Sequence, residues 1–146
     1  MLKINNEDIE GIYLLSEEEA QNIPSWILAC GGSWWLRSAL ALYSYGAWYV
    51  NGYYGYLDND DYSATNLVRP AFSITNLDNQ GLEIGETVKV LGRIAQYIGN
   101  NSVLLCDGIG ERRFDGESND YEKSEIKRYI ESWLAKELKK VRIINN

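Results

Sequence analysis

The stretch that decides the fold is "GGSWWLRSALALYSYGAWYVNGYYGYLDNDDYSATNLVRPAF", residues 31–72. It contains three runs of strand-forming aromatic residues: "SWWLRS" at 33–38, "AWYVN" at 47–51 and "YYGYL" at 53–57. The dipeptide Asn51-Gly52 between the last two runs favours a type I′ hairpin turn, because both central positions of that turn need positive φ. A fourth run, "LVRPAFSI" at 67–74, contains Pro70, which favours an edge position or a bulge. These runs predict antiparallel strands.

The same stretch contains no Lys or Arg between Arg37 and Arg69 and is crowded with Tyr, Asn, Asp, Ser and Gly. Because one domain has one core, the tyrosines cannot all be buried, and Tyr among small polar residues is typical of antibody paratopes. The alternative is a structural role, in which a Tyr-rich sheet face packs against a loop. We expect a ligand-binding surface made by Tyr43, Tyr45, Tyr49, Asn51, Tyr53, Tyr54, Tyr56, Asp58, Asn59, Asp60 and Tyr62.

Four further residues of the stretch are expected to be structural. We predict that Trp34 and Trp35 lie in the core or under a loop. Arg37 and Arg69 stand close to the ends of the basic-free interval, and each guanidinium can tie loop carbonyls or a carboxylate together with its fork of donors. A substrate-binding arginine is the alternative.

The segments before and after this stretch predict two helices and a hairpin. In "IYLLSEEEAQNI" (12–23) a strand precedes a short helix, with Ser16 and Glu19 spaced as a capping box and Pro24 as its end. Residues 75–86 form a connector, and 87–108 form a hairpin that turns at Gly99-Asn100-Asn101. A polar loop, 111–123, leads to the last helix.

The last helix is expected to begin after Ser124, a plausible N-cap. Its apolar residues recur at spacings typical of one helix face: Ile126, Ile130, Trp133, Leu134, Leu138 and Val141. Its C-terminal end carries cations that suit the helix dipole: Lys136, Lys139, Lys140 and Arg142.

Composition excludes several classes of function. The chain has 146 residues, which fits one domain, and its net charge of −7 opposes nucleic-acid binding. It has no histidine, so Ser-His-Asp and Cys-His catalysis are excluded within the chain. "LDNDD" (57–61) lacks the Gly and Glu of an EF-hand loop and predicts a solvated acidic turn. We expect neither a metal nor a cofactor.

The two cysteines, Cys30 and Cys106, are expected to be buried free thiols, with a disulfide between them as the alternative. The chain has no apolar run long enough to span a membrane and no signal peptide at its N-terminus. We therefore expect no membrane insertion, and a location in the cytoplasm or in a phage particle assembled there.

At "SWWLRS", "AWYVN" and "LVRPAF" the sequence resembles a bacterial and phage domain of uncharacterised function. The matching residues are Trp34 to Ser38, Ala47 with Tyr49 to Asn51, and Val68 to Ala71, with Leu67 where that domain usually has Gly. "YLLSEEEA" and the segment from Cys106 to Ile130 also match. The resemblance implies an α+β domain of the C-type-lectin-like fold shared with formylglycine-generating-enzyme-like proteins. It also implies kinship with the variable proteins of diversity-generating retroelements.

The two halves stand in the reverse of the order usual for that domain. We divide the single domain 1–146 into the half 1–74, the connector 75–86 and the half 87–146, and interpret the order as a circular permutation. Exchange of halves between two copies, a piece cut from a tandem array and an engineered or scrambled scaffold are the alternatives. A homo-oligomer or a half-exchanged dimer would fit the exchange of halves between two copies.

The expected function is therefore binding of a protein or cell-surface ligand, without catalysis, by a surface that a retroelement can diversify. The main alternative is a structural or decoration domain whose tyrosines pack against a neighbouring subunit. A formylglycine-type enzyme is a weaker alternative, because Cys30 and Cys106 match no motif of those enzymes.

Overall fold

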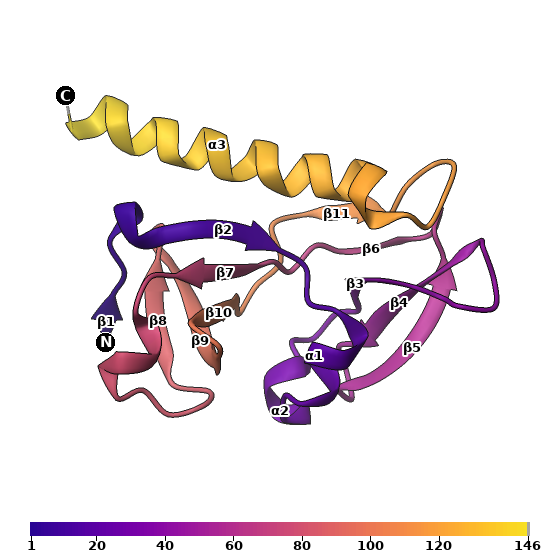
Figure 1. The fold of residues 1–146 in the computed structure, drawn as a ribbon, viewed down its shortest axis with the longest axis horizontal. Coiled ribbons are helices and arrows are strands. Elements are labelled where there is room, and N and C mark those ends of the chain that lie inside the picture. The colour runs from indigo at the N-terminus through magenta and orange to yellow at the C-terminus, as the bar shows by residue number, and fades with distance from the viewer. Residues whose placement is uncertain (146) are drawn as a thin grey trace.

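A computed structural model describes residues 1–145, and the side chains of residues 1–140. Its strands form two sheets that lie side by side (Figure 1). The six-stranded sheet has the order β1 (Leu2–Lys3), β8 (Thr87–Val90), β9 (Arg93–Gly99), β10 (Ser102–Leu105), β7 (Ala71–Ile74), β2 (Ile9–Tyr13). The five-stranded sheet has the order β11 (Glu111–Arg113), β6 (Thr65–Leu67), β3 (Trp34–Ala39), β4 (Gly46–Asn51), β5 (Tyr56–Asp61).

The helices lie on opposite sides of these sheets. The described residues form three α-helices rather than the two expected: α1 (Glu17–Gln21), α2 (Ser25–Leu28) and α3 (Glu125–Asn145). Three short 3₁₀ turns accompany them, at Asn6–Asp8, Leu77–Gln80 and Tyr121–Lys123. Figure 1 shows α3 lying along β2, while α1 and α2 lie beside the five-stranded sheet. The expected α+β class, with mostly antiparallel strands, is confirmed.

The core is built where the two sheets and α3 meet. Trp34, Leu36 and Val50 pack with residues of α1 and α2, whereas Trp35 packs with Phe114 and with Ile126 of α3. A third cluster lies within the six-stranded sheet around Phe72. The two adjacent tryptophans thus face opposite sides of β3, as the alternation of a strand requires.

Both helix starts agree with the sequence. The Ser16 Oγ accepts from the backbone N–H of Glu19 at 3.0 Å, and a Glu19 oxygen accepts from the N–H of Ser16 at 2.8 Å, which completes the capping box. The Ser124 Oγ accepts from the N–H of Lys127 at 3.1 Å. Val141 and Arg142 fall within the backbone of α3, but their side chains lie outside the described residues.

The predicted type I′ turn at Asn51-Gly52 is wrong. The loop between β4 and β5 has four residues, 52–55, and its positive φ falls on Gly55, at 78°. Gly52 is needed for another reason: a Cβ there would lie 1.5 Å from the carbonyl oxygen of Gly32. The carbonyl of Gly52 accepts from the N–H groups of Cys30 and Gly31, both at 2.9 Å. The glycine therefore allows two backbone segments to touch.

Three further expectations are corrected. "LDNDD" is not a turn, because Leu57 to Asp61 continue β5, where pairing with β4 overrides the low strand propensity of Asp and Asn. The run 67–74 is not one strand: Pro70 lies between β6 and β7, and so no sheet position has to lose its N–H donor. Residues 87–105 form two hairpins, because Leu91 and Gly92 add a turn with φ of 51° and 74°.

The expected turn at Gly99-Asn100-Asn101 is confirmed, with all three residues at positive φ. Of the described helices, none combines the length and the apolar character that crossing a membrane requires.

Candidate binding surface

The expected binding residues come mostly from the β4–β5 hairpin, whose register decides which of them share a face. Tyr49 lies opposite Asp58, and Asn51 lies opposite Tyr56. Ala47, opposite Asp60, belongs to the same face because side chains alternate along each strand. The opposite face carries Trp48, Val50 and Leu57, which pack on the cluster around Trp34. The face with Tyr49 is partly packed as well, because Ala47 is buried and the Tyr49 ring lies edge-on to Trp35; its exposed part is Tyr56 and Asp58 of β5.

The loop of the hairpin carries the most exposed rings. Tyr53 is 68% exposed and Tyr54 is 75% exposed. Tyr54 stacks on Tyr56 with ring centroids 6.2 Å apart and planes 8° apart. The carboxamide of Asn51 fixes the loop, because it donates to the Tyr56 hydroxyl and accepts from the N–H of Tyr53, each at 3.0 Å. The stacked rings of Tyr54 and Tyr56 and the backbone at Tyr53 are therefore held in place, while the three rings stay exposed.

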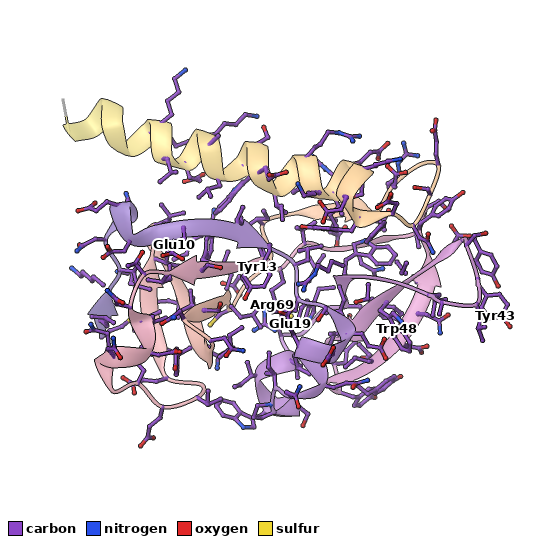
Figure 2. All side chains as sticks on the ribbon, in the orientation of Figure 1. Glu10, Tyr13, Glu19, Tyr43, Trp48 and Arg69 are labelled. Atoms are coloured by element: carbon purple, nitrogen blue, oxygen red, sulfur yellow. The ribbon has the colours of Figure 1, made fainter. Side chains whose placement is uncertain are left out.

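A second pair of rings lies in the loop that joins β3 to β4. Tyr43 and Tyr45 are each about half exposed, and their centroids are 5.4 Å apart. Figure 2 shows Tyr43 at the tip of this loop, at one end of the molecule. The carboxamide of Asn119 donates to the carbonyl of Gly46 at 2.9 Å and ties the loop to the chain before α3. Asn119 was not expected to have this role, since nothing in the sequence places it near residue 46.

The acidic residues of β5 are hydrogen-bonded but have no cationic partner among the described side chains. The Asp58 and Asp60 carboxylates accept from the N–H groups of Asn59 and Asp61, at 2.8 and 2.9 Å. Since β5 is the last strand of its sheet, these carboxylates satisfy backbone donors of an open edge. Burial, and then the charges of Asp58 and Asp60, raise the pKa of Tyr49, which is therefore a neutral hydrogen-bonding group at neutral pH.

Two of the expected residues do not belong to this face. Asn59 lies opposite Trp48, on the other side of the hairpin. Tyr62 is half-buried at the edge of the cluster around Trp35, and its carbonyl accepts from the N–H groups of Phe114 and Asp115. The structure places the rest in two groups, one at each end of β4, which we together call the tyrosine surface: Tyr43, Tyr45, Tyr49, Asn51, Tyr53, Tyr54, Tyr56, Asp58 and Asp60.

Arg69 is buried in the core and bonded to backbone carbonyls. It is 1% exposed, donates from Nε to the carbonyl of Leu105 and from Nη1 to the carbonyl of Ile27 at 2.9 Å, and stacks over Trp34 at 5.0 Å. Burial lowers its pKa, but a guanidinium starts so high that it stays charged. Arg69 therefore joins α2 to β10, across the two halves of the chain.

Arg37 has the same kind of role nearer the surface. Its Nη1 donates to the carbonyl of Leu14 at 2.7 Å and to a Glu19 oxygen at 2.6 Å. Burial raises the pKa of Glu19, but the bonds from Arg37 and Ser16 outweigh it, so the net pKa is lowered. Trp34 and Trp35 are fully buried, and their indole N–H groups donate to backbone carbonyls at 3.0 and 2.9 Å.

Cys30 and Cys106 are both free, as expected, but each is partly exposed rather than buried. Burial raises the pKa of the Cys106 thiol, and the charge of Arg69 lowers it in part. Within the described residues, no group of three or more His, Cys, Asp or Glu side chains is placed to hold a metal ion.

Sequence reasoning missed two exposed apolar side chains and one cleft. Trp26 of α2 is 61% exposed and lies against Gly85. Leu42, in the loop that joins β3 to β4, is 87% exposed. The cleft lies between α1 and the β9–β10 turn. Its residues come from separate segments, and no local pattern relates them.

The chain was compared with family models, curated proteins and solved structures. No curated protein and no solved structure matches it. One family model, described as a domain of unknown function (DUF6273), matches residues 4–76. These 73 residues are half of the 146-residue chain and include β2 to β7, and so the whole β4–β5 hairpin. The chain therefore belongs to the DUF6273 family of domains of unknown function.

Proposed function

We propose that this protein binds a protein or cell-surface ligand through the tyrosine surface and catalyses no reaction. One observation carries the proposal. The most exposed tyrosine rings, Tyr53 and Tyr54, stand on a hairpin whose opposite face is anchored in the core. Rings that are ordered before binding lose little entropy when a ligand arrives, and Tyr contributes a large amphipathic area.

The charge of the surface restricts the partner. Asp58 and Asp60 lie on the tyrosine face without an ion pair to any described side chain, and residues 38–68 contain no Lys or Arg. A partner with a basic surface would meet complementary charge, which speeds encounter and selects against acidic partners. Nucleic acid is disfavoured for the same reason, because phosphates would face carboxylates.

For the fold we propose a circularly permuted C-type-lectin-like domain. The connector 75–86 joins β7 to β8, and β7 pairs directly with β10 of the second half. Pairing of the two halves within one chain is what a permuted domain requires. A tyrosine surface of this composition would also suit diversification by a retroelement, in a phage or bacterial protein. A near-identical repeat in the neighbouring DNA that differs only at adenines would test that origin.

The test of function compares binding and stability in the same variants. The purified protein would be screened against an array of bacterial surface proteins and against whole cells. Every hit would be measured again with the triple variant Tyr53→Ala, Tyr54→Ala, Tyr56→Ala. The matched control replaces exposed apolar residues of the connector and of the second half, Ile84→Ala with Ile94→Ala.

We expect the triple variant to weaken each genuine hit at least tenfold while its melting temperature stays within a few degrees of the wild type. Equal binding by the triple variant would disprove the proposal. If the wild type forms an oligomer that the triple variant does not, the tyrosines pack against a second subunit, and the structural alternative holds instead.

A further inference from the structure

A cleft of about 450 Å³ lies between α1 and the β9–β10 turn, away from the tyrosine surface. Its floor is a row of hydroxyl groups, Tyr13, Ser73 and Ser102, from the neighbouring strands β2, β7 and β10. Its volume falls within the range of small-molecule sites. In Figure 2, Tyr13 and Glu19 lie near the middle of the molecule, whereas Tyr43 and Trp48 lie toward one end.

The hydroxyl groups of the floor are already oriented. The Tyr13 hydroxyl donates to the Ser102 Oγ at 2.8 Å, and the Ser102 Oγ donates to the carbonyl of Asn100 at 3.1 Å. Burial raises the pKa of Tyr13, so its phenol stays neutral. Because the hydroxyl proton of Tyr13 is engaged, its oxygen faces a ligand as an acceptor.

The wall formed by α1 adds two carboxylates, from Glu18 and Glu19. The bonds from Arg37 and from the N–H of Ser16 both fall on Glu19 Oε1, which leaves Oε2 for a ligand. The exposed Glu18 carboxylate forms no ion pair with any side chain that the structure describes. The cleft therefore has acceptors in excess.

The remaining lining decides the class of ligand. None of the lining residues is Lys or Arg, and Arg37, which bonds to the lining residue Glu19, already has its Nη1 engaged by Glu19 Oε1 and the Leu14 carbonyl. Leu15, Ile23 and Ile98 provide an apolar side for a hydrocarbon stem. We propose that this cleft binds a primary ammonium group on an unbranched aliphatic stem, with the ammonium at Glu18 and Glu19. An ammonium group has three donors and no acceptor, which matches this lining.

Two sources carry that chemistry, a free alkyl diamine and the side chain of lysine. The test is a titration of the ¹⁵N-labelled protein followed by amide chemical shifts. The first probe is cadaverine, and the second is Nα-acetyl-lysine N-methylamide, a blocked lysine. We expect saturable shifts at Ser73, Gly99 and Ser102 with at least one probe, and the tighter probe identifies the source.

Variants separate this cleft from general attraction of cations to an acidic protein. Glu18→Gln should weaken binding about tenfold, and Asn22→Lys, which places a cation at the rim, should abolish it. The matched control Glu83→Gln and the double variant Asp58→Asn, Asp60→Asn should leave the affinity unchanged. Glu18, Asn22 and Glu83 are exposed, so their variants should fold.

Three results would overturn the proposal. The first is the absence of saturable shifts in the cleft with both probes. The second is equal affinity of the wild type and Glu18→Gln. The third is equal binding of 1-pentanol and pentylamine, which would show that the stem alone is recognised and the ammonium group is not.

Discussion

Replacing Gly52 by alanine should destabilise the protein severely, although Gly52 lies in a loop and its φ is not positive, because the residue is buried. The reason is steric overlap between the added side chain and the backbone of Gly32. The added Cβ would lie 1.5 Å from the Gly32 carbonyl oxygen and 2.3 Å from the Gly32 carbonyl carbon. Both are backbone atoms, which cannot rotate away as a flexible side chain would. The segments around residues 32 and 52 would have to move apart.

The cost follows from what that movement breaks. The carbonyl of Gly52 would lose its bonds from Cys30 and Gly31, each worth about 1 kcal/mol. Overpacking of this kind adds about 1–3 kcal/mol. The free energy of unfolding should therefore fall by about 4 kcal/mol, out of the 5–15 kcal/mol typical of native domains. For a chain of this length the melting temperature should fall by about 10 °C.

The assay is thermal and urea unfolding followed by circular dichroism, with Gly11→Ala as the matched control. Gly11 lies in β2 and, like Gly52, has no positive φ, but a Cβ there would meet nothing within 4 Å. We expect the control to melt at or slightly above the wild-type temperature, because alanine restricts the unfolded chain. A Gly52→Ala protein that melts within 2 °C or so of the control would refute the reasoning.

Two further predictions concern the arginine framework. Arg69→Met should lower the free energy of unfolding by about 3 kcal/mol, because buried carbonyls lose their donor, whereas Arg37→Met should cost about 1 kcal/mol at its half-exposed ion pair. Equal urea midpoints for the two variants would contradict this assignment. The pKa of Glu19 is lowered on folding, so its stabilisation is complete above its ordinary pKa of 4.5 and is lost as pH falls through the folded value. The difference in unfolding free energy between the wild type and Glu19→Gln should therefore shrink from about pH 6 to pH 3, and a constant difference would count against the ion pair.

The elements that could be predicted from the sequence are those with local causes. Ser16 and Glu19 stand three residues apart, and the capping box forms wherever that spacing precedes a helix. The strands β3 and β4 follow from runs rich in aromatic residues, which have a high strand propensity. Alternation correctly places Tyr49 and Asn51 on one face of the β4–β5 hairpin, but the packing of Tyr49 against Trp35 is not visible in the local sequence.

The features that could not be predicted from the sequence depend on contacts between segments that lie far apart in the chain. Nothing next to Gly52 in the sequence indicates that Gly32 touches it, so the dipeptide Asn51-Gly52 was interpreted as a turn. "LDNDD" has the composition of a loop, and only pairing with β4 makes it a strand. The cleft is assembled from β2, α1, β7 and the β9–β10 turn, and no single stretch of sequence describes it.

The central claim is that an anchored hairpin holds tyrosine rings in solvent, and nitration by tetranitromethane followed by mass spectrometry tests it most directly. In dilute native protein, Tyr53 and Tyr54, at 68% and 75% exposure, should be modified first. Tyr97, at 8% exposure and bonded to Asp78 at 2.6 Å, should be modified last. If Tyr53 and Tyr54 react as slowly as Tyr97 while the protein is monomeric, the rings are not displayed and the account is wrong.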